Sequence, residues 1–434
     1  MSRLPTVLLV LLALSLVGCA TTEDTGGVRD SDFGFADPNA ARGFSLVPPA
    51  DDIKTIQLHR AGDESSLPIV GLSSGQQLTL SFDLLDETTG RPLSVYFYHA
   101  DRNWERSLLP VEYLASAVTD DLFDYRISGT ADLRYVHYAY NFPNERIRFL
   151  RSGNYLVRVA EQGREQEPLF ERAFFVSEQA AEVEMLLSSS LLGTGGSFAQ
   201  PVVQFRPTQQ FDVSAFDYDV CFARNGRFDL TQCAGEPSLV EAALLQFFLP
   251  PERGFQNAEP TYQLDLGQLA AGGDILEANL GVFPYEVTLD PDFARFGNAT
   301  LDAPLSGQPL VADAVFGVPE PATQAEYVQA TFSYVPDGER RLRGPVILSG
   351  AFNGWLIDPA NELSWVPSEG RYEGTFLLKQ GRYLYRYVVE DPLERERLRR
   401  EIGLVPSLYT ALVYVRDFTR NTDRLIATRS IVSR

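Results

Sequence analysis

Few residues in this chain have the type and spacing that catalysis requires. Gly71-Leu72-Ser73-Ser74-Gly75 matches the Gly-x-Ser-x-Gly pattern of a nucleophile elbow. The pattern precedes a strand instead of joining a strand to a helix, so we interpret Ser73 as a turn residue. His99 stands two positions before Asp101. We interpret it as a core or loop histidine, and an acid–base pair with Asp101 is the alternative.

Metal and cofactor motifs are also missing from the sequence. The histidines are His59, His99 and His137, which do not have the spacing of metal ligands, and we find no zinc, EF-hand, P-loop or dinucleotide motif. We therefore expect no catalytic residue, no metal and no cofactor. A glycosidase-like carboxylate pair stays open as an alternative, because 58 acidic residues form pairs by chance.

The charge of the chain excludes one class of partner. The 434 residues have a formal net charge of −21, and lysine occurs only at Lys54 and Lys379. A general nucleic-acid binder needs the opposite sign, so we expect no nucleic-acid partner.

The beginning of the sequence indicates export. An apolar run from Val7 to Val17 follows Arg3 and is too short to span a bilayer. It ends in Leu16-Val17-Gly18-Cys19, which resembles a bacterial lipobox. The resemblance implies a signal peptide over 1–18, acylation of Cys19 and, because Ala20 and not Asp follows, sorting to the outer membrane. Residues 19–49 are polar and are expected to form a flexible tether.

Two cysteines remain once Cys19 is assigned to lipid. Cys221 and Cys233 would lie in an oxidising compartment, where an even number of cysteines favours a disulfide. Closing this short loop would stabilise the fold by roughly 3 kcal/mol. Two buried thiols are the alternative.

The elements that must position these residues read as strands. Short apolar or alternating segments recur between Gly, Asp, Asn and Pro, as in Gln77–Phe82, Asn154–Val159 and Tyr383–Val389. This pattern is typical of β-sandwiches. We therefore predict an all-β protein of three consecutive immunoglobulin-like or early-set sandwiches. Their expected boundaries are 50–178, 179–322 and 323–434.

Several segments together resemble the type IX secretion system plug protein family. They include Tyr98-His99-Ala100-Asp101-Arg102-Asn103-Trp104, Phe142-Pro143-Asn144-Glu145 and Asn421-Thr422-Asp423-Arg424-Leu425-Ile426. The family usually has Cys where Ala100 stands. The resemblance is strongest in the first block. It implies a non-enzymatic periplasmic protein that occludes the periplasmic opening of the outer-membrane translocon barrel.

The last block carries a second resemblance. Gly350-Ala351-Phe352-Asn353-Gly354-Trp355, followed by Leu378 to Val388, looks like an early-set domain, a group that includes glycogen-binding modules. Trp355 and Trp365 would then stack on sugar rings. Packing of Trp355 within the sandwich is the alternative.

These observations give one main functional hypothesis. We expect an outer-membrane lipoprotein, anchored through Cys19 and facing the periplasm, that plugs or gates the type IX translocon barrel. A glycan-binding lipoprotein that uses Trp355 and Trp365 is the alternative hypothesis.

Overall fold

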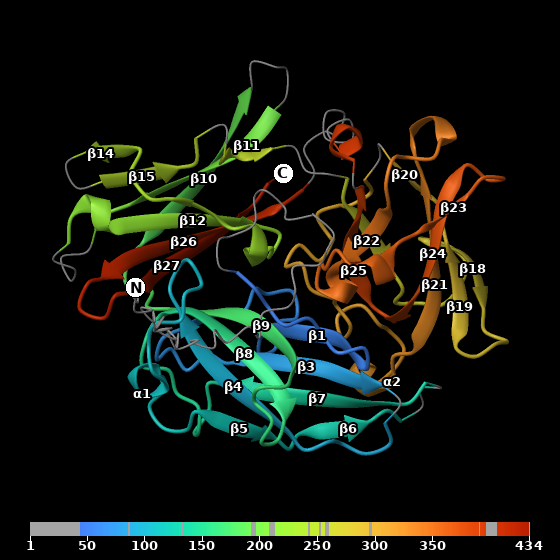
Figure 1. Ribbon diagram of the computed structural model, residues 1–434, viewed down its shortest axis with the longest axis horizontal. Helices are drawn as coiled ribbons and strands as arrows, with labels where there is room; N and C mark the ends of the chain where they lie inside the picture. Colours follow the sequence, from blue (N-terminus) through green and yellow to red (C-terminus); the bar gives the residue numbers. More distant parts are fainter. Residues whose placement is uncertain are drawn as a thin grey trace, which may run out of the picture.

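The computed structural model describes residues 44–433 except 86, 130, 132, 192–196, 208–212, 242–243, 251–252, 257–259, 295–296, 390 and 396–405. Nearly all regular structure among them is β, arranged in six sheets that pack as three sandwiches (Figure 1). The prediction of an all-β sandwich protein is confirmed.

The first sandwich occupies the bottom of Figure 1. One sheet has the order β1–β3–β7–β6, with β1 at Ile53–Arg60, β3 at Leu78–Leu85, β7 at Tyr135–Phe142 and β6 at Tyr125–Ile127. The other has the order β2–β9–β8–β4–β5, with β2 at Ile69–Gly71, β9 at Pro168–Ser177, β8 at Gly153–Glu161, β4 at Leu93–Ala100 and β5 at Thr119–Leu122. The short helix α1 is Pro110–Tyr113. Alternating apolar residues such as Phe82, Val95 and Val157 fill the space between the sheets.

The second sandwich lies at the upper left of Figure 1. Its first sheet has the order β10–β11–β15–β14, with β10 at Val183–Leu191, β11 at Ser197–Phe205, β15 at Leu244–Phe248 and β14 at Leu239–Glu241; β16 at Phe255–Gln256 also pairs with β11. Its second sheet has the order β13–β12–β26–β27, with β13 at Gln232–Ala234, β12 at Tyr218–Arg224, β26 at Leu408–Asp417 and β27 at Thr422–Val432.

The third sandwich lies on the right of Figure 1. One sheet has the order β17–β25–β22, with β17 at Tyr262–Asp265, β25 at Arg382–Val389 and β22 at Val346–Gly350. The other has the order β18–β19–β21–β24–β23, with β18 at Ile275–Asn279, β19 at Tyr285–Leu289, β21 at Tyr327–Val335, β24 at Arg371–Lys379 and β23 at Ser364–Val366; β20 at Asp292–Phe293 also pairs with β21. The short helix α2 is Pro321–Gln324.

This strand pairing corrects the expected boundaries 179–322 and 323–434. Strands β17 to β20 precede residue 322 but belong to the third sandwich, whereas β26 and β27 return to the second. In Figure 1 the red strands β26 and β27 therefore lie beside the green strand β12 and away from the orange strands. The third sandwich is inserted between the strands of the second.

The sequence of β26 explains why it returns to the second sandwich. Tyr409, Ala411 and Val413 point into the core of the second sandwich, while Leu412 and Tyr414 pack in a cluster shared with the first. Side chains alternate between the two faces of a strand, so a strand that is apolar on both faces needs a cover on each side. Only a central strand between two sandwiches meets that need here.

No helix in the described part of the chain is long and apolar enough to cross a membrane.

Candidate functional site

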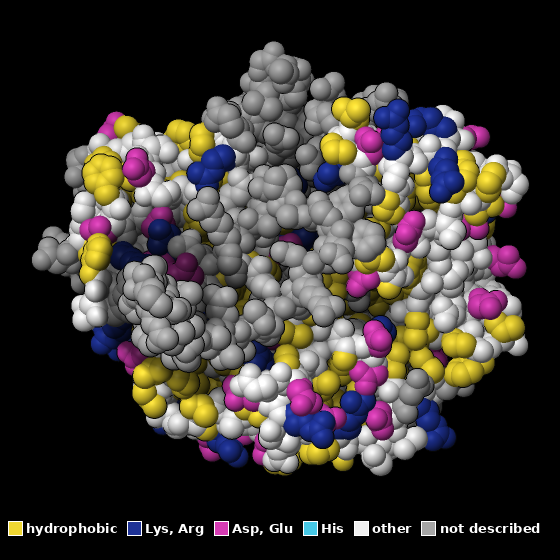
Figure 2. Space-filling view, viewed as in Figure 1, with side chains coloured by type: hydrophobic (Ala, Val, Ile, Leu, Met, Phe, Trp, Pro, Cys, Tyr) yellow, Lys and Arg dark blue, Asp and Glu magenta, His cyan; other side chains and the backbone are white. Residues whose placement is uncertain are grey.

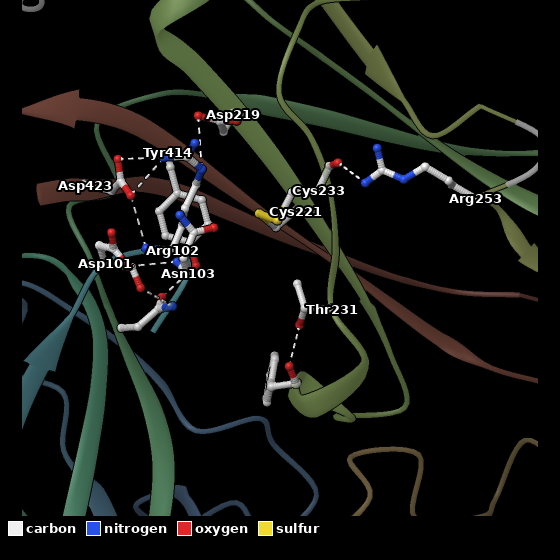
Figure 3. The surroundings of a disulfide bond; sticks show 12 residues. Asp101, Arg102, Asn103, Asp219, Cys221, Thr231, Cys233, Arg253, Tyr414 and Asp423 are labelled. Carbon is white, nitrogen blue, oxygen red and sulfur yellow. Dashed lines mark hydrogen bonds and ion pairs between the residues drawn. A yellow bond between two sulfur atoms is a disulfide. The ribbon is translucent and has the colours of Figure 1, made fainter. Parts of the chain in front are cut away.

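The predicted site residues fall in different parts of the molecule. Cys19, the predicted acylation site, lies outside the described residues. Cys221 and Cys233 are register partners on β12 and β13 and are joined by a disulfide (Figure 3). Among the described residues, no group of His, Cys, Asp and Glu is arranged to hold a metal ion.

The two residues weighed for catalysis have structural surroundings. Ser73 lies in a turn between β2 and β3 with a φ of 58°. His99 is buried in the first sandwich, where its Nε2 lies 3.0 Å from the carbonyl oxygen of Ser152, and burial lowers its pKa. The Asp101 carboxylate instead accepts hydrogen bonds from the backbone N–H groups of Asn103 and Glu105.

A buried charge cluster joins the first sandwich to the third. Asp83 on β3 lies 2.7 Å from Lys379 Nζ at the end of β24 and 2.7 Å from His137 Nδ1 on β7. The Tyr327 hydroxyl donates a third hydrogen bond to Asp83, also 2.7 Å long. Lys379 Nζ also donates to the carbonyl oxygen of Ala322. We call Asp83, His137, Tyr327 and Lys379 the Asp83 cluster.

The Asp83 cluster is closed to solvent, since the side chains of Asp83 and Lys379 are each 1% exposed. Burial alone would raise the pKa of the Asp83 carboxyl, but the Lys379 ammonium and His137 together lower it below its usual value. Burial also lowers the pKa of Lys379, against the attraction of Asp83. Each charge in this cluster is therefore tolerated only because its partners are present.

A second, more open charge cluster joins the first sandwich to the second. Arg102, in the loop after β4, contacts Asp423 on β27 at 3.1 Å and Asp219 on β12 at 3.2 Å. Arg416 on β26 lies 3.2 Å from Asp423 and 4.0 Å from Asp101. We call these five residues the Arg102 cluster; Figure 3 shows Arg102 reaching from the first sandwich toward both Asp219 and Asp423.

The Arg102 cluster contains three carboxylates and two guanidinium groups, so its charges do not balance. Burial, with the nearby charge of Asp423 added, raises the pKa of Asp219 to about 6 even though Arg102 opposes the shift. The Arg102 side chain is 23% exposed, so water reaches this cluster.

Apolar contacts reinforce the same junction. Trp104, Leu156 and Phe175 of the first sandwich pack against Phe228 and Leu412 of the second. Relative motion between domains is the default unless the interface is large and apolar. The apolar layer and the two charge clusters therefore favour a single stiff body.

A cavity of about 460 Å³ lies where all three sandwiches meet, and we call it the central cavity. Its wall combines residues 44–49 with parts of β1, β9, the segment 226–229, the segment 306–309 and the turn 354–358. The segment 44–49 is held against β9 by hydrogen bonds between Val47 and Glu171.

Two glycines permit the close approach that shapes one side of the central cavity. Gly226 has a φ of 66°, and a Cβ atom there would lie 1.9 Å from the carbonyl oxygen of Ser306. Gly307 has a φ of 76°, and its Cβ would lie 2.4 Å from the carbonyl oxygen of Asn225. Any side chain at either position would push the second and third sandwiches apart.

The structure does not bring the two predicted sugar-stacking residues together. Trp355 lines the central cavity, where its Nε1 donates to the carbonyl oxygen of Gly307 at 2.7 Å and the Arg227 guanidinium lies 4.9 Å from its ring centre. Trp365 packs on Tyr372 at the core of the third sandwich. Glycan binding by the pair stays a prediction.

Exposed apolar side chains are frequent on the first sandwich around α1, β5 and β6. Val111 is 75% exposed and Phe123 is 77% exposed, and Leu109, Tyr125 and Ile127 are also exposed. Figure 2 shows hydrophobic side chains gathered at the lower left, over the position of α1 in Figure 1. Exposed apolar side chains of this kind often mark a surface that binds a protein.

The roles of the charged residues at the junctions were not predicted from the sequence. The sequence did single out Lys379, because it is one of only two lysines and follows five uncharged residues, 374–378, at the end of a strand. Arg172 carried a weaker signal, as a charge within the buried strand β9. Nothing in the sequence indicated which distant residues would meet them.

The chain is similar to one protein family over its first sandwich and to solved structures over its whole fold. Residues 53–178 match the family model of the type 9 secretion system plug protein 1st domain. The match covers the first sandwich and indicates an envelope-associated protein with a role linked to type IX secretion. The matched family is a secretion-system domain and not a known enzyme family.

The whole fold has a counterpart among solved structures. A crystal structure of a hypothetical protein from Parabacteroides merdae ATCC 43184 aligns with a TM-score of 0.78 and 21% identity, covering 90% of this chain and all of that one. This likeness shows a shared fold. A structure titled "Biofilm associated protein - B domain" has a TM-score of only 0.16, which is too low to support an argument. No curated protein matched the chain.

Proposed function

We propose that this protein is a non-enzymatic outer-membrane lipoprotein that plugs or gates the periplasmic opening of the type IX secretion translocon barrel. The observation that carries the proposal is the match of residues 53–178 to the plug protein's first domain. Cys19 is the proposed site of acylation. A lipid anchor there would hold the protein at high local concentration near the barrel.

The physical requirements of a plug support this assignment. A plug must resist deformation while it blocks an opening, and it must present a surface that fits its partner. The Asp83 cluster and the Arg102 cluster tie the first sandwich to the other two. The exposed apolar side chains around α1 and β5, on the matched domain, are the surface that we assign to the barrel.

The test is affinity capture of the tagged protein from solubilised outer membranes of its own host, followed by mass spectrometry. We expect the wild-type protein to recover a very large β-barrel subunit. Val111→Asp and Phe123→Asp should each reduce that recovery at least about tenfold, because a buried unpaired carboxylate disfavours an apolar contact.

Phe418→Asp is the matched control, because Phe418 is also highly exposed, at 69%, but lies between β26 and β27 of the second sandwich. It should leave barrel recovery unchanged. Absence of a barrel from the wild-type sample, combined with retention on an α-glucan column that Trp355→Ala abolishes, would overturn the proposal in favour of glycan binding.

Anchoring is tested separately with Cys19→Ser. We expect this variant to leave the membrane fraction and to keep its ability to bind the solubilised barrel. Membrane association that is unchanged by the substitution would contradict the lipid anchor without bearing on the plug surface.

A further inference from the structure

The central cavity contains a cationic group for which the described residues supply no anion. Arg172 extends from β9 to lie against Gly354, where a Cβ atom would be 3.4 Å from Arg172 Nη2. Its Nη1 donates to the carbonyl oxygen of Glu171 at 2.8 Å, and no carboxylate of the described residues forms an ion pair with it. Burial lowers the pKa of Arg172 to about 10, so the group stays charged at neutral pH.

The second arginine of the cavity, Arg227, has an ion-pair partner. Arg227 forms an ion pair with Asp229 and lies over the ring of Trp355. The charge of Arg227 is therefore compensated by Asp229, whereas no carboxylate of the described residues compensates the charge of Arg172.

One hydroxyl group beside the cavity does not contribute to it. Ser306 is 4% exposed, and its Oγ has no hydrogen-bond partner among the described residues. The Oγ atom is fully buried, so the hydroxyl does not face the cavity and is not assigned to a ligand.

Two other polar side chains of the wall, Gln308 and Asp358, accept hydrogen bonds from the backbone. Gln308 Oε1 accepts a hydrogen bond from the backbone N–H of Leu58. Asp358 is exposed, and its carboxylate accepts one from the backbone N–H of Ala360. The rest of the wall is mainly apolar and includes Leu46, Ile56 and Ile357.

We propose that the central cavity binds a small carboxylate with an apolar body, whose acid group pairs with Arg172. A guanidinium group suits a planar carboxylate, because its N–H groups can donate to both oxygens. Arg172 has no ion pair among the described residues, whereas the Asp358 carboxylate of the wall is exposed, so a monoanion fits beside Arg172. The volume of the cavity lies within the range of small-molecule sites. The apolar side chains of the wall, such as Leu46, Ile56 and Ile357, favour a ligand with an apolar body.

The proposal is tested by isothermal titration of the purified full chain at pH 7.5 with hexanoate, octanoate and decanoate. We expect saturable binding that tightens up to roughly fourfold for each added methylene, as apolar burial predicts. The neutral analogue 1-octanol should bind more weakly than octanoate by about tenfold or more, because it cannot pair with the Arg172 charge.

Substitution identifies the group that recognises the acid. Arg172→Met should weaken octanoate binding by about tenfold or more and leave 1-octanol binding unchanged. Arg164→Met is the matched control, since Arg164 is an exposed arginine of the same sandwich outside the cavity wall, and it should change neither affinity.

Ile357→Trp provides an independent variant if Arg172→Met fails to fold. It keeps Arg172 and fills the cavity, so octanoate should no longer bind. Failure of octanoate to saturate the wild-type chain, equal affinities for octanoate and 1-octanol, or unchanged octanoate binding in the folded Arg172→Met variant would each overturn the proposal. The assay needs no translocon, so its outcome is separate from that of the plug proposal.

Discussion

The Asp83 cluster and the Arg102 cluster accommodate charged side chains at the two junctions of the first sandwich in different ways. At the Asp83 cluster, a carboxylate and an ammonium are both 1% exposed, and each charge is met by fixed partners. At the Arg102 cluster, three acids share two arginines and water reaches the side chains. Complete burial demands complete pairing, whereas partial exposure tolerates an excess of one sign. Removing one partner from the Asp83 cluster should therefore cause a large loss in the free energy of unfolding. Removing one partner from the Arg102 cluster should cause a smaller loss.

Lys379→Met is the substitution with the largest expected effect on the Asp83 cluster. The substitution keeps the length of the side chain but leaves Asp83 buried without its main counter-charge, so we expect a loss of about 3–5 kcal/mol in the free energy of unfolding. Urea unfolding monitored by circular dichroism measures this loss. The double variant Asp83→Asn/Lys379→Met should recover part of it. A loss below about 1 kcal/mol in the single variant would contradict the assignment of a buried, paired charge.

The second junction has a covalent support that the first lacks. Cys221 faces the apolar layer between the first two sandwiches, and the disulfide ties its strand to β13. Replacing both cysteines by alanine should lower the free energy of unfolding by about 3 kcal/mol, as expected for a short closed loop. Thermal unfolding of the variant and of the reduced wild type should agree. An unfolding midpoint that a reductant leaves unchanged would count against this role.

Arg102→Met tests whether the open junction weakens gradually. Asp423 keeps its contact with Arg416, and water can reach the site, so we expect a loss of about 2 kcal/mol. Arg60→Met is the control, because Arg60 pairs with Asp63 in an exposed pair that should contribute about 0–1 kcal/mol. A loss at Arg102 as large as that at Lys379 would remove the distinction between the two junctions.

A further effect depends on pH and concerns Asp219. The pKa of Asp219 is raised by burial to about 6 in the folded protein, above the 3.8 of a free aspartate side chain, so the folded state binds the proton more tightly. This group's contribution to stability therefore rises as pH falls from about 7 to 4, by on the order of 2 kcal/mol. Asp83 behaves oppositely, because its lowered pKa gives a contribution that is lost only below about pH 4.

Asp219→Asn removes the titrating carboxyl group and so tests its contribution to the pH dependence of stability. The difference between wild type and variant in urea midpoints, measured from pH 7 to pH 4, should show the rise in wild type alone. Parallel pH profiles for the two proteins would show that Asp219 does not carry an unfavourable charge at neutral pH.

The local structure could be predicted from the sequence to a greater extent than the long-range structure. Segments such as Gln77–Phe82 and Asn154–Val159 show their strand character in their own alternation, and they fall on β3 and β8. The partners of β26 could not be read in the same way, because pairing depends on residues far away in the chain. The sequence signal was the run from Tyr409 to Val415, which is apolar apart from Thr410; the structure shows that all of these residues are buried, so both faces of the strand are covered.

The central cavity shows why the candidate site was harder to predict than the fold. Arg172, Ser306 and Trp355 belong to separate segments, and each reads in the sequence as an ordinary strand or loop residue. Their meeting depends on glycines that allow two loops to touch, and on the segment 44–49. Such a site exists only after the sandwiches have assembled.

The insertion of the third sandwich into the second has a consequence for the order of synthesis. The first sandwich has all its strands by Ser177 and can close while the rest of the chain is still being made. The sheet around β12 must wait for Leu408–Val432. The last two strands, β26 and β27, therefore complete the second sandwich only at the end of synthesis. A chain that ended before Leu408 would lack two strands of the second sandwich, so the middle of the protein would not fold.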